Sequence, residues 1–405
     1  MGGLILPEAG WRTREGMDAL LGALGAGEGL SRFVGGAVRD TLLGLDVQDV
    51  DIATRLMPDD VMKRLRKAGI KAIPTGIEHG TVTAILKDGP VEVTTLRRDV
   101  STDGRRATVA FSDDWREDAA RRDFTINALY ADPLTGEIHD FFGGMDDLAA
   151  HHVRFIGDAL TRIAEDHLRI LRFFRFHARF GKGSADAEAI DACRARSRDL
   201  MALSRERIAD ELLKLLALPN PAPTIALMLE LGIFSAVIPE IDATSLVRLE
   251  QLLANEARTA TTPDPLRRLI ALAPQETGPA DDIAARLRLS NAQRKRITTA
   301  LTPNTAGPME MLYRWGPESS TDRLLLSDTE GDVIAAALTR IRASERPKLP
   351  LGGGSLVERG LSAGPVVAKA LQTVERRWID EDFPGPERVN AIADEVVGQL
   401  LDARQ

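Results

Sequence analysis

The sequence predicts an α+β domain at its N-terminal end, followed by an all-helical remainder. Runs of β-branched residues occur before about residue 150. From about residue 153 onward, segments rich in Ala, Leu and Arg with a 3.6-residue periodicity dominate. The 405 residues predict two to four domains at roughly 100–200 residues each. With 44% apolar and 28% charged residues, the composition is globular, which excludes collagen-like and low-complexity classes.

Strand signals are clearest in two parts of the N-terminal domain. Residues 81–86 and 91–96 are β-branched runs separated by residues 87–90, Lys-Asp-Gly-Pro, which is typical of a hairpin. Residues 46–54 alternate polar and aliphatic side chains, as a half-buried strand does. Proline- and glycine-rich segments then punctuate the helical part at 219–223, 263–265 and 348–354.

Charge and special residues narrow the function. Acidic residues outnumber basic residues 60 to 52, and the net charge of −8 by itself argues against a nucleic-acid partner. The single cysteine, Cys193, excludes an intrachain disulfide framework and a zinc site of several thiolates. All six histidines lie in the first 180 residues, so we expect no histidine-ligated metal hydrolase in the C-terminal half. Without a signal peptide or a membrane-length apolar run, a soluble cytoplasmic protein with no membrane contact is expected.

The densest chemical signal lies between residues 34 and 51. Gly35 and Gly36 precede an expected helix start, where backbone N–H groups favour a phosphate, and Arg39 adds a guanidinium one turn later. Asp49 and Asp51 are two residues apart on an expected strand, so both carboxylates project from one face. Mg²⁺ held by this pair and by substrate phosphates would relieve their repulsion. The alternative is a Gly-Gly turn followed by a solvated acidic strand end.

Residues 35–40 together with residues 49–51 resemble the first motif of the class II tRNA nucleotidyltransferase and bacterial poly(A) polymerase superfamily. Four segments similar to further motifs of that superfamily follow in order at residues 121–128, 140–148, 165–169 and 203–208. The resemblance implies a polymerase-β-like nucleotidyltransferase head with a mixed sheet and helices, followed by an all-α neck, body and tail. The expected boundaries are 1–152 for the catalytic head, 153–215 for the nucleotide-recognising neck, 216–305 for the body and 306–405 for the tRNA-binding tail.

A stripe of arginines is expected on one helix around residues 162–179. Its members are Arg162, Arg169, Arg172, Arg175 and Arg179, and no acid lies between 169 and 179. Such a stripe favours an anion in front of it, the alternative being a solvated basic face. Asp166 and Arg169 share a helix face at this spacing, which taken alone indicates an intrahelical ion pair. In the context of the resemblance they would instead recognise the base edges of C and A.

The resemblance also implies a role for each remaining site residue. Asp49 and Asp51 would hold two Mg²⁺ ions, and Glu92 is either a third carboxylate or an exposed strand residue. The residues implied to grip the triphosphate are Gly36, Arg39, Arg122, Arg172 and Arg175. Asn127 would help select ribose, and Asp123 would orient Arg122 or cap a helix. Residues 97–115 would form a polar mobile loop that switches from C to A addition, or an ordinary hairpin connection.

The implied function is the template-independent addition of C, C and A to tRNA 3′ ends from CTP and ATP, with release of pyrophosphate. Residues 74–82 resemble the CCA-adding branch. The alternatives are a poly(A) polymerase, an enzyme that adds only CC or only A, and a non-catalytic RNA-binding module. The net charge does not oppose an RNA partner, because the four arginines from Arg169 to Arg179 form a local basic segment. The sequence predicts no oligomeric state.

Overall fold

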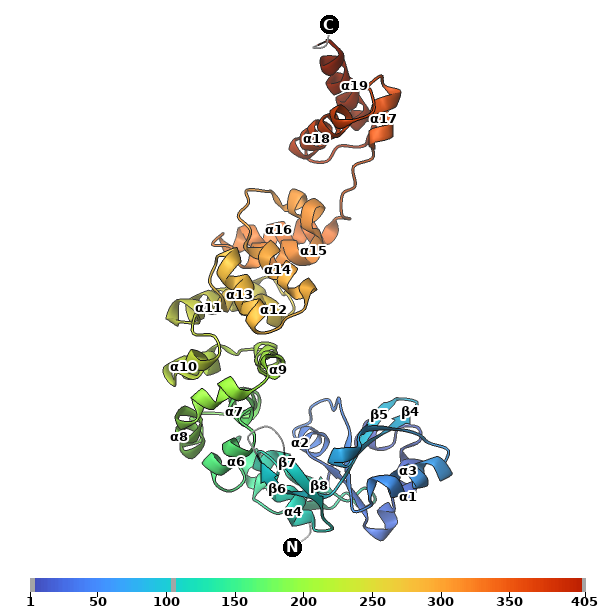
Figure 1. Ribbon diagram of the computed structural model, residues 1–405, viewed down its shortest axis with the longest axis vertical. Coiled ribbons are helices and arrows are strands. Elements are labelled where there is room, and N and C mark those ends of the chain that lie inside the picture. Colours follow the sequence, from blue (N-terminus) through green and yellow to red (C-terminus); the bar gives the residue numbers. More distant parts are fainter. Residues whose placement is uncertain (1–3, 103–106, 403–405) are drawn as a thin grey trace. The chain divides into compact units, whose positions relative to one another are not determined.

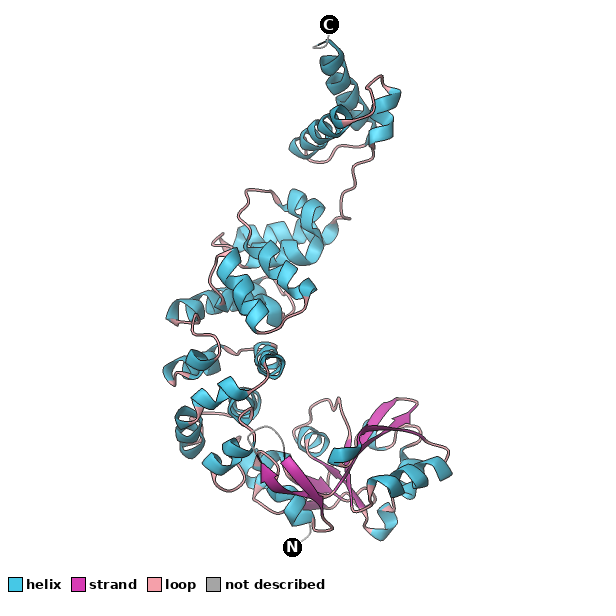
Figure 2. Cartoon of the chain, viewed as in Figure 1, coloured by secondary structure: helices cyan, strands magenta, loops and turns pink. Residues whose placement is uncertain are grey.

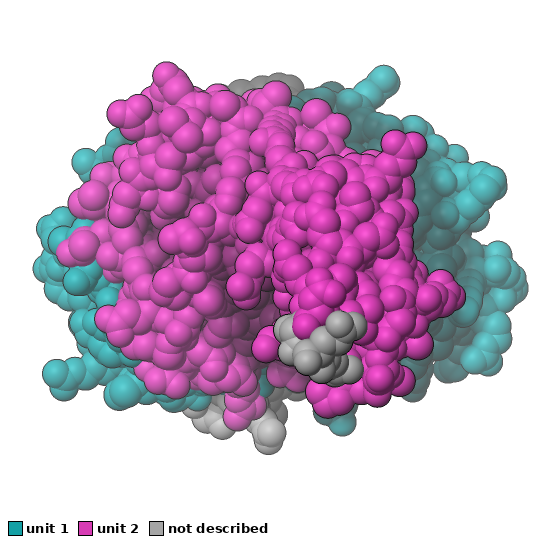
Figure 3. All heavy atoms as spheres, turned by 90° about the horizontal axis from the view of Figure 1, so that it is seen from above, with its two compact units in different colours: residues 1–243 teal, residues 244–405 magenta. Residues whose placement is uncertain are grey.

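The chain forms two compact units in a computed structural model that describes residues 4–102 and 107–402. The first unit comprises residues 1–243 and the second residues 244–405, coloured separately in Figure 3. All strands of the described chain lie in the first unit, and the second unit is built from helices (Figure 2). This confirms an α+β domain followed by a helical remainder.

A seven-stranded mixed sheet forms the centre of the N-terminal domain (Figure 1). Its strands, in spatial order, are β3 (Lys71–Gly76), β4 (Thr81–Leu86), β5 (Gly89–Thr95), β2 (Asp51–Thr54), β1 (Ser31–Val34), β8 (Leu129–Ala131) and β9 (Ile138–Asp140). β2 and β5 are parallel, and every other neighbouring pair is antiparallel. The β4–β5 pair confirms the expected hairpin. The strand expected over residues 46–54 is shorter, because it begins at Asp51 and leaves Asp49 in the preceding loop.

A separate two-stranded sheet forms where a polar loop was expected. β6 (Arg97–Thr102) and β7 (Ala107–Phe111) pair in antiparallel register, from Arg97 opposite Phe111 to Thr102 opposite Ala107. The pairing of β6 with β7 favours the alternative of a hairpin connection, and the tip at 103–106, where the sequence has Asp-Gly-Arg-Arg, lies outside the described residues.

Five helices accompany the sheet of the N-terminal domain: α1 (Met17–Ala23), α2 (Gly36–Leu42), α3 (Pro58–Lys67), α4 (Trp115–Ala120) and α5 (Gly144–Ala149). α2 follows β1 after one residue, Gly35, whose φ of 71° lies in the left-handed region that favours glycine. α4 begins after Asp114, whose side chain accepts a hydrogen bond from the Arg116 N–H. α2 packs against β1 and β8, and α4 packs against β6.

The rest of the first unit is helical: α6 (Ala159–Glu165), α7 (Arg169–Phe180), α8 (Ala187–Ala195), α9 (Arg205–Leu216) and α10 (Ala222–Glu230). The single helix expected around residues 162–179 is therefore two helices. The chain leaves the helical conformation at Asp166, with φ −149° and ψ 105°. Four phenylalanines of α7 are at most 6% exposed and form its core face: Phe173, Phe174, Phe176 and Phe180. The arginines of α7 lie beside this face, with Arg172 and Arg175 stacked over the Phe176 ring and Arg179 over the Phe180 ring.

α11 (Ala243–Arg258) begins at the last residue of the first unit and continues into the second. The other helices of the second unit are α12 (Pro265–Leu272), α13 (Thr277–Arg286), α14 (Asn291–Leu301), α15 (Pro308–Leu325), α16 (Gly331–Ala343), α17 (Gly353–Glu358), α18 (Pro365–Asp380) and α19 (Pro386–Asp402). α15 is kinked at Gly316, which has a φ of 78° and precedes Pro317. Among the helices of the described chain, none is both long enough and apolar enough to cross a membrane.

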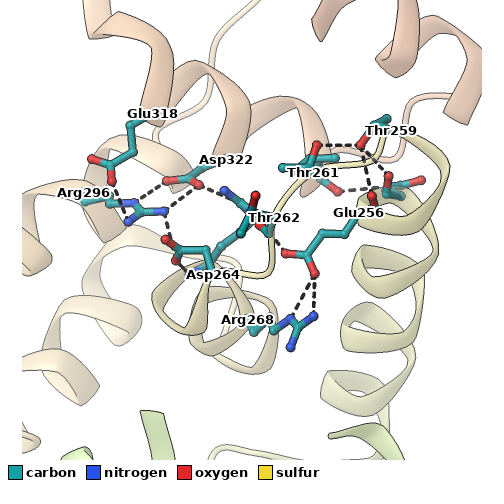
Figure 4. Close-up of polar contacts among 12 residues, drawn as sticks. Glu256, Thr259, Thr261, Thr262, Asp264, Arg268, Arg296, Glu318 and Asp322 are labelled. Carbon is teal, nitrogen blue, oxygen red and sulfur yellow. Dashed lines mark hydrogen bonds and ion pairs between the residues drawn. The ribbon is translucent and has the colours of Figure 1, made fainter. Parts of the chain in front are cut away.

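A buried network of ion pairs joins α11, α12, α14 and α15 (Figure 4). Glu256 accepts hydrogen bonds from Arg267 at 2.9 Å and from Arg268 at 2.8 and 3.0 Å. Asp322 forms ion pairs with Arg267 at 2.8 Å and with Arg296 at 2.6 Å. Glu256 and Asp322 are 3% and 0% exposed, so each needs its arginine partners to remain charged in the core.

Candidate nucleotide-binding site

A cavity of about 880 Å³ lies within the first unit and contains every site residue expected from the sequence. These residues are Gly36, Arg39, Asp49, Asp51, Arg122, Asp123, Asn127, Asp166, Arg169, Arg172 and Arg175. The lining includes nine basic and five acidic side chains, so the cavity is basic although the whole chain has a net charge of −8. The cavity therefore suits an anionic ligand.

Asp49 and Asp51 line the cavity near the start of β2, and Glu92 lies on the neighbouring strand. Asp51, the first residue of β2, lies opposite Glu92 of the parallel strand β5, and Asp49 precedes Asp51 in the loop. Burial raises the pKa of Asp51 and nearby Arg122 opposes the rise, but Glu92 and Asp49 raise the pKa further, to about 6. The mutual repulsion expected for this acidic pair is therefore present, and Glu92 adds to it.

Arg39 is buried and contacts other residues of the protein as well as the cavity. It is 5% exposed, donates to Asp40 at 2.7 Å and to the side-chain oxygen of Asn127, and stacks 4.2 Å from the ring centre of Phe180. Asn127 in turn donates to Asp123 at 2.9 Å. Arg39 thus holds Asn127 in position at the cavity wall, and burial lowers the pKa of its guanidinium even though Asp40 opposes this.

Arg122 is held by a carboxylate that the sequence analysis did not single out. Its Nη2 donates to Asp118 at 3.2 Å and its Nε donates to the Tyr130 hydroxyl at 3.1 Å. The expectation that Asp123 orients Arg122 is therefore wrong. A local signal for Asp118 exists, because Arg121 and Arg122 follow it at the i+3 and i+4 positions on a helix.

Asp123 and Glu211 hold the arginines of α7. Arg172 donates to Asp123 from two nitrogens at 2.5 and 2.8 Å, and Arg175 donates to Glu211 at 2.6 and 3.3 Å. Burial would raise the pKa of Asp123, but Arg172 and the hydrogen bond from Asn127 outweigh it and lower that pKa to about 2. Glu211, on α9, is 3% exposed and was missed by the sequence analysis, since nothing near it in the sequence reveals its partner.

The expected pair of Asp166 and Arg169 is arranged differently from a shared helix face. Asp166 ends α6 and its carboxylate pairs with Arg207 at 2.7 Å, whereas Arg169 pairs with Glu165 at 2.5 Å. The expected intrahelical ion pair between Asp166 and Arg169 is therefore not formed. Both residues nevertheless line the same cavity. Arg169 is held further by the backbone oxygens of residues 121 and 162, each at 2.8 Å.

Comparisons with known proteins agree with this geometry. Residues 31–154 match the family described as the poly A polymerase head domain, and residues 186–244 match the probable RNA and SrmB-binding site of polymerase A. The chain is 34% identical over 366 residues to the mitochondrial CCA tRNA nucleotidyltransferase 1 of Mus musculus, covering 86% of this chain and 82% of that protein. It is 30% identical over 377 residues to the CCA-adding enzyme of Latilactobacillus sakei, covering 87% and 90%.

A solved structure shares the architecture. The CCA-adding enzyme of Bacillus stearothermophilus in complex with CTP superposes with a TM-score of 0.73 at 28% identity, covering 96% of this chain and all of that chain. These similarities cover between 86% and 96% of the chain. The chain belongs to the family of CCA-adding tRNA nucleotidyltransferases and is itself a nucleotidyltransferase.

Proposed function

We propose that this protein adds C, C and A to the 3′ end of tRNA, using CTP and ATP and releasing pyrophosphate. The observation that carries this proposal is the basic cavity that Asp49 and Asp51 line together with the two arginines that follow α4 and the arginines of α7. The names of the relatives support CCA as the product. The solved relative in complex with CTP supports a nucleoside triphosphate as the substrate.

The donor set at the sheet edge fits a divalent cation. Asp49 and Asp51 offer carboxylate oxygens, and Glu92 lies next to Asp51 on the neighbouring strand. Mg²⁺ is commonly bound by one or two carboxylates together with substrate phosphates and water. Within the described residues, no group of three or more His, Cys, Asp or Glu side chains is arranged as a metal site. We propose that Asp49 and Asp51 hold two Mg²⁺ ions together with substrate phosphates.

When bound, the two Mg²⁺ ions would lower the pKa of the attacking 3′-hydroxyl and neutralise the leaving phosphates. The protein residues bind and orient the reactants. Arg122, Arg172 and Arg175 present guanidinium groups to the triphosphate, and each is held by a carboxylate of the protein, so little side-chain entropy remains to be lost on binding. Gly36 leaves room for a phosphate beside them. Asn127, held by Arg39 and Asp123, is placed to contact the ribose.

Base choice is assigned to Asp166 and Arg169. A carboxylate accepts from the exocyclic amine of cytosine or adenine, and a guanidinium donates to ring acceptors, so guanine and uracil would leave polar groups unpaired. In the structure the Asp166 carboxylate pairs with Arg207. Asp166 would therefore give up this ion pair when it accepts a hydrogen bond from the base of a bound nucleotide. The segment at residues 97–115, which contains β6 and β7, is assigned to the switch from C to A addition.

The four-part division of the chain stays a proposal. We assign nucleotide addition to residues 1–152, nucleotide recognition to 153–215 and tRNA binding to 306–405, with the body at 216–305 between them. A cytoplasmic location also stays a prediction, since the relatives include mitochondrial enzymes.

The test is incorporation into a tRNA that lacks its 3′ CCA, with each labelled nucleotide supplied separately and then together. Growth limited to C, C and A is the expected result. Long A-tails would indicate a poly(A) polymerase, and growth that ends after CC or adds only A would indicate a partial enzyme. Asp49→Ala and Asp51→Ala should abolish incorporation while tRNA binding is retained, whereas Asp46→Ala in the same exposed loop is the matched control. No incorporation by the wild-type protein would indicate an RNA-binding module.

A further inference from the structure

Asp118 lies on α4 behind the wall of the nucleotide cavity. It is 1% exposed and does not itself line the cavity. Its Oδ2 accepts from the Tyr130 hydroxyl at 2.6 Å and from Arg122 at 3.2 Å. Its Oδ1 accepts from Arg121 Nε at 2.8 Å and from the backbone N–H of Arg97 at 3.2 Å. One buried carboxylate therefore holds two cavity arginines and the first residue of β6.

Tyr130 completes the support of Arg122. Its hydroxyl donates to Asp118 and accepts from Arg122 Nε at 3.1 Å, so Tyr130 bridges the acid and the arginine. The Tyr130 ring is fully buried and packs edge to face with Trp115 at 5.6 Å and with Phe141 at 5.9 Å. This packing fixes the hydroxyl, and hence the place at which Arg122 is held.

The remaining guanidinium nitrogen of Arg122 points to the glycine turn. Nε and Nη2 are bonded to Tyr130 and Asp118, while Nη1 lies 3.4 Å from the position that a Cβ on Gly35 would occupy. Gly35 lines the cavity and precedes α2. The protein thus uses two of the three nitrogens of Arg122 for orientation and presents the third at the site assigned to the triphosphate.

The charge of Asp118 also matters in this position. Arg39, Arg169, Arg172 and Arg175 line the same cavity as Arg122, and like charges would move an unsupported guanidinium away from them. Burial alone would raise the pKa of Asp118, but Arg122, Arg121 and the hydrogen bond from Tyr130 outweigh burial and lower the pKa to about 2. Asp118 is therefore ionised at neutral pH, which keeps it a charged partner for both arginines.

We propose that Asp118, together with Tyr130, is a positioning residue that sets Arg122 for binding the triphosphate of the incoming nucleotide. This inference rests on the proposed function in naming the ligand. Because Asp118 acts through Arg122, which is assigned to the triphosphate, its loss should weaken the binding of CTP and ATP alike. Base choice, assigned to Asp166 and Arg169 elsewhere in the cavity, should not change.

The experiment compares purified full-length wild-type protein with Asp118→Asn, which keeps the shape of the side chain and removes its charge. Calorimetric binding is measured for CTP, inorganic pyrophosphate and cytidine. We expect Asp118→Asn to weaken CTP and pyrophosphate about tenfold, the loss expected for one hydrogen bond to a charged group, and to leave cytidine unchanged. In primer extension, the KM values for CTP and ATP should rise by the same factor, with a smaller change in kcat.

Three further variants separate positioning from a general loss of structure. Tyr130→Phe removes the bridging hydroxyl but keeps the carboxylate, so it should weaken pyrophosphate about threefold even if Asp118→Asn folds poorly. Glu117→Gln is the matched control, because this neighbouring acid of α4 pairs with Ser112 and Arg98 instead of the cavity arginines. Adding Asp118→Asn to Arg122→Ala should weaken pyrophosphate binding no further, since the acid acts through that arginine.

The inference is overturned if Asp118→Asn or Tyr130→Phe lowers the active fraction while the affinities for CTP and pyrophosphate stay at the wild-type value. It is also overturned if cytidine binding falls as much as pyrophosphate binding. A wild-type protein that binds CTP but adds no C to tRNA would refute the proposed function instead, and the pyrophosphate comparison would still report on Asp118.

Discussion

Replacing Asp51 by asparagine should abolish nucleotide incorporation and, without divalent cations, stabilise the first unit. In the folded chain, burial raises the pKa of Asp51, Arg122 opposes the rise, and Glu92 and Asp49 bring the value to about 6. A carboxyl group whose pKa is higher in the folded than in the unfolded chain lowers stability when it is ionised. The cost is therefore present above pH 6, and it disappears as the pH falls toward 4 and the folded protein takes up the proton.

The magnitude follows from the size of this pKa shift. The rise from 3.8 to about 6 corresponds to about 3 kcal/mol at roughly 1.36 kcal/mol per unit. Because Asp51 is only partly buried and lines the cavity, solvent screening reduces this figure. We expect Asp51→Asn to raise the free energy of unfolding by about 1–2 kcal/mol near neutral pH and to leave it unchanged near pH 4.

The assay is urea unfolding in EDTA at several pH values between about 4 and 7.5, with hydrogen exchange of the β1, β2 and β5 amides reporting on the first unit. Asp46→Asn, in the exposed loop before the strand, is the matched control and should not change the stability. Adding Mg²⁺ should stabilise the wild-type protein and reverse the order of the two stabilities. The reasoning is refuted if Asp51→Asn is less stable than wild type in EDTA near neutral pH, or if the difference does not change with pH.

Three other predictions follow from the structure. Asp166→Ala or Arg169→Ala should relax base choice more than it weakens triphosphate binding, measured as the ratio of C to U incorporation; unchanged fidelity in both variants would contradict their assignment. Glu256→Gln should lower the unfolding free energy of the second unit by about 3–5 kcal/mol, because it removes the carboxylate shared by two buried guanidiniums. A loss below 1 kcal/mol in urea unfolding would show that the network tolerates the change. Asp118 and Asp123 have pKa values of about 2, lowered against the effect of burial by their arginine partners, so each should contribute about 2 kcal/mol above pH 4 that is lost as the pH falls toward 2. Acid titration followed by circular dichroism checks this, and Asp118→Asn should lose part of that pH dependence.

Much of the candidate site was predictable because its motifs are local. Gly35, Asp49 and Asp51 lie within one short segment, and the structure brings this segment to the same cavity as the arginines of α7. Local sequence also predicted the β4–β5 hairpin, whose β-branched runs flank a Lys-Asp-Gly-Pro turn. The break at Asp166 was missed, because the arginine periodicity continues across it while the backbone does not.

The support of the arginines was not predictable from local sequence. Arg175 and Glu211 are 36 residues apart, Arg172 and Asp123 are 49 residues apart, and neither spacing indicates an ion pair. From the sequence alone, the basic side chains of α7 were predicted to bind an external anion. In the folded chain, part of the neutralising charge comes from the protein's own buried carboxylates.

The sequence by itself determined the fold class, the order of the motifs and the residue types of the site, since periodicity, turn residues and short-range spacing are properties of consecutive residues. Only the tertiary structure decided which acid partners each arginine, that Asp51 is the first residue of its strand, and that β6 pairs with β7. These features depend on contacts between segments far apart in the chain. A buried charge takes whichever partner the packing places within hydrogen-bonding distance, and packing is set by the whole fold.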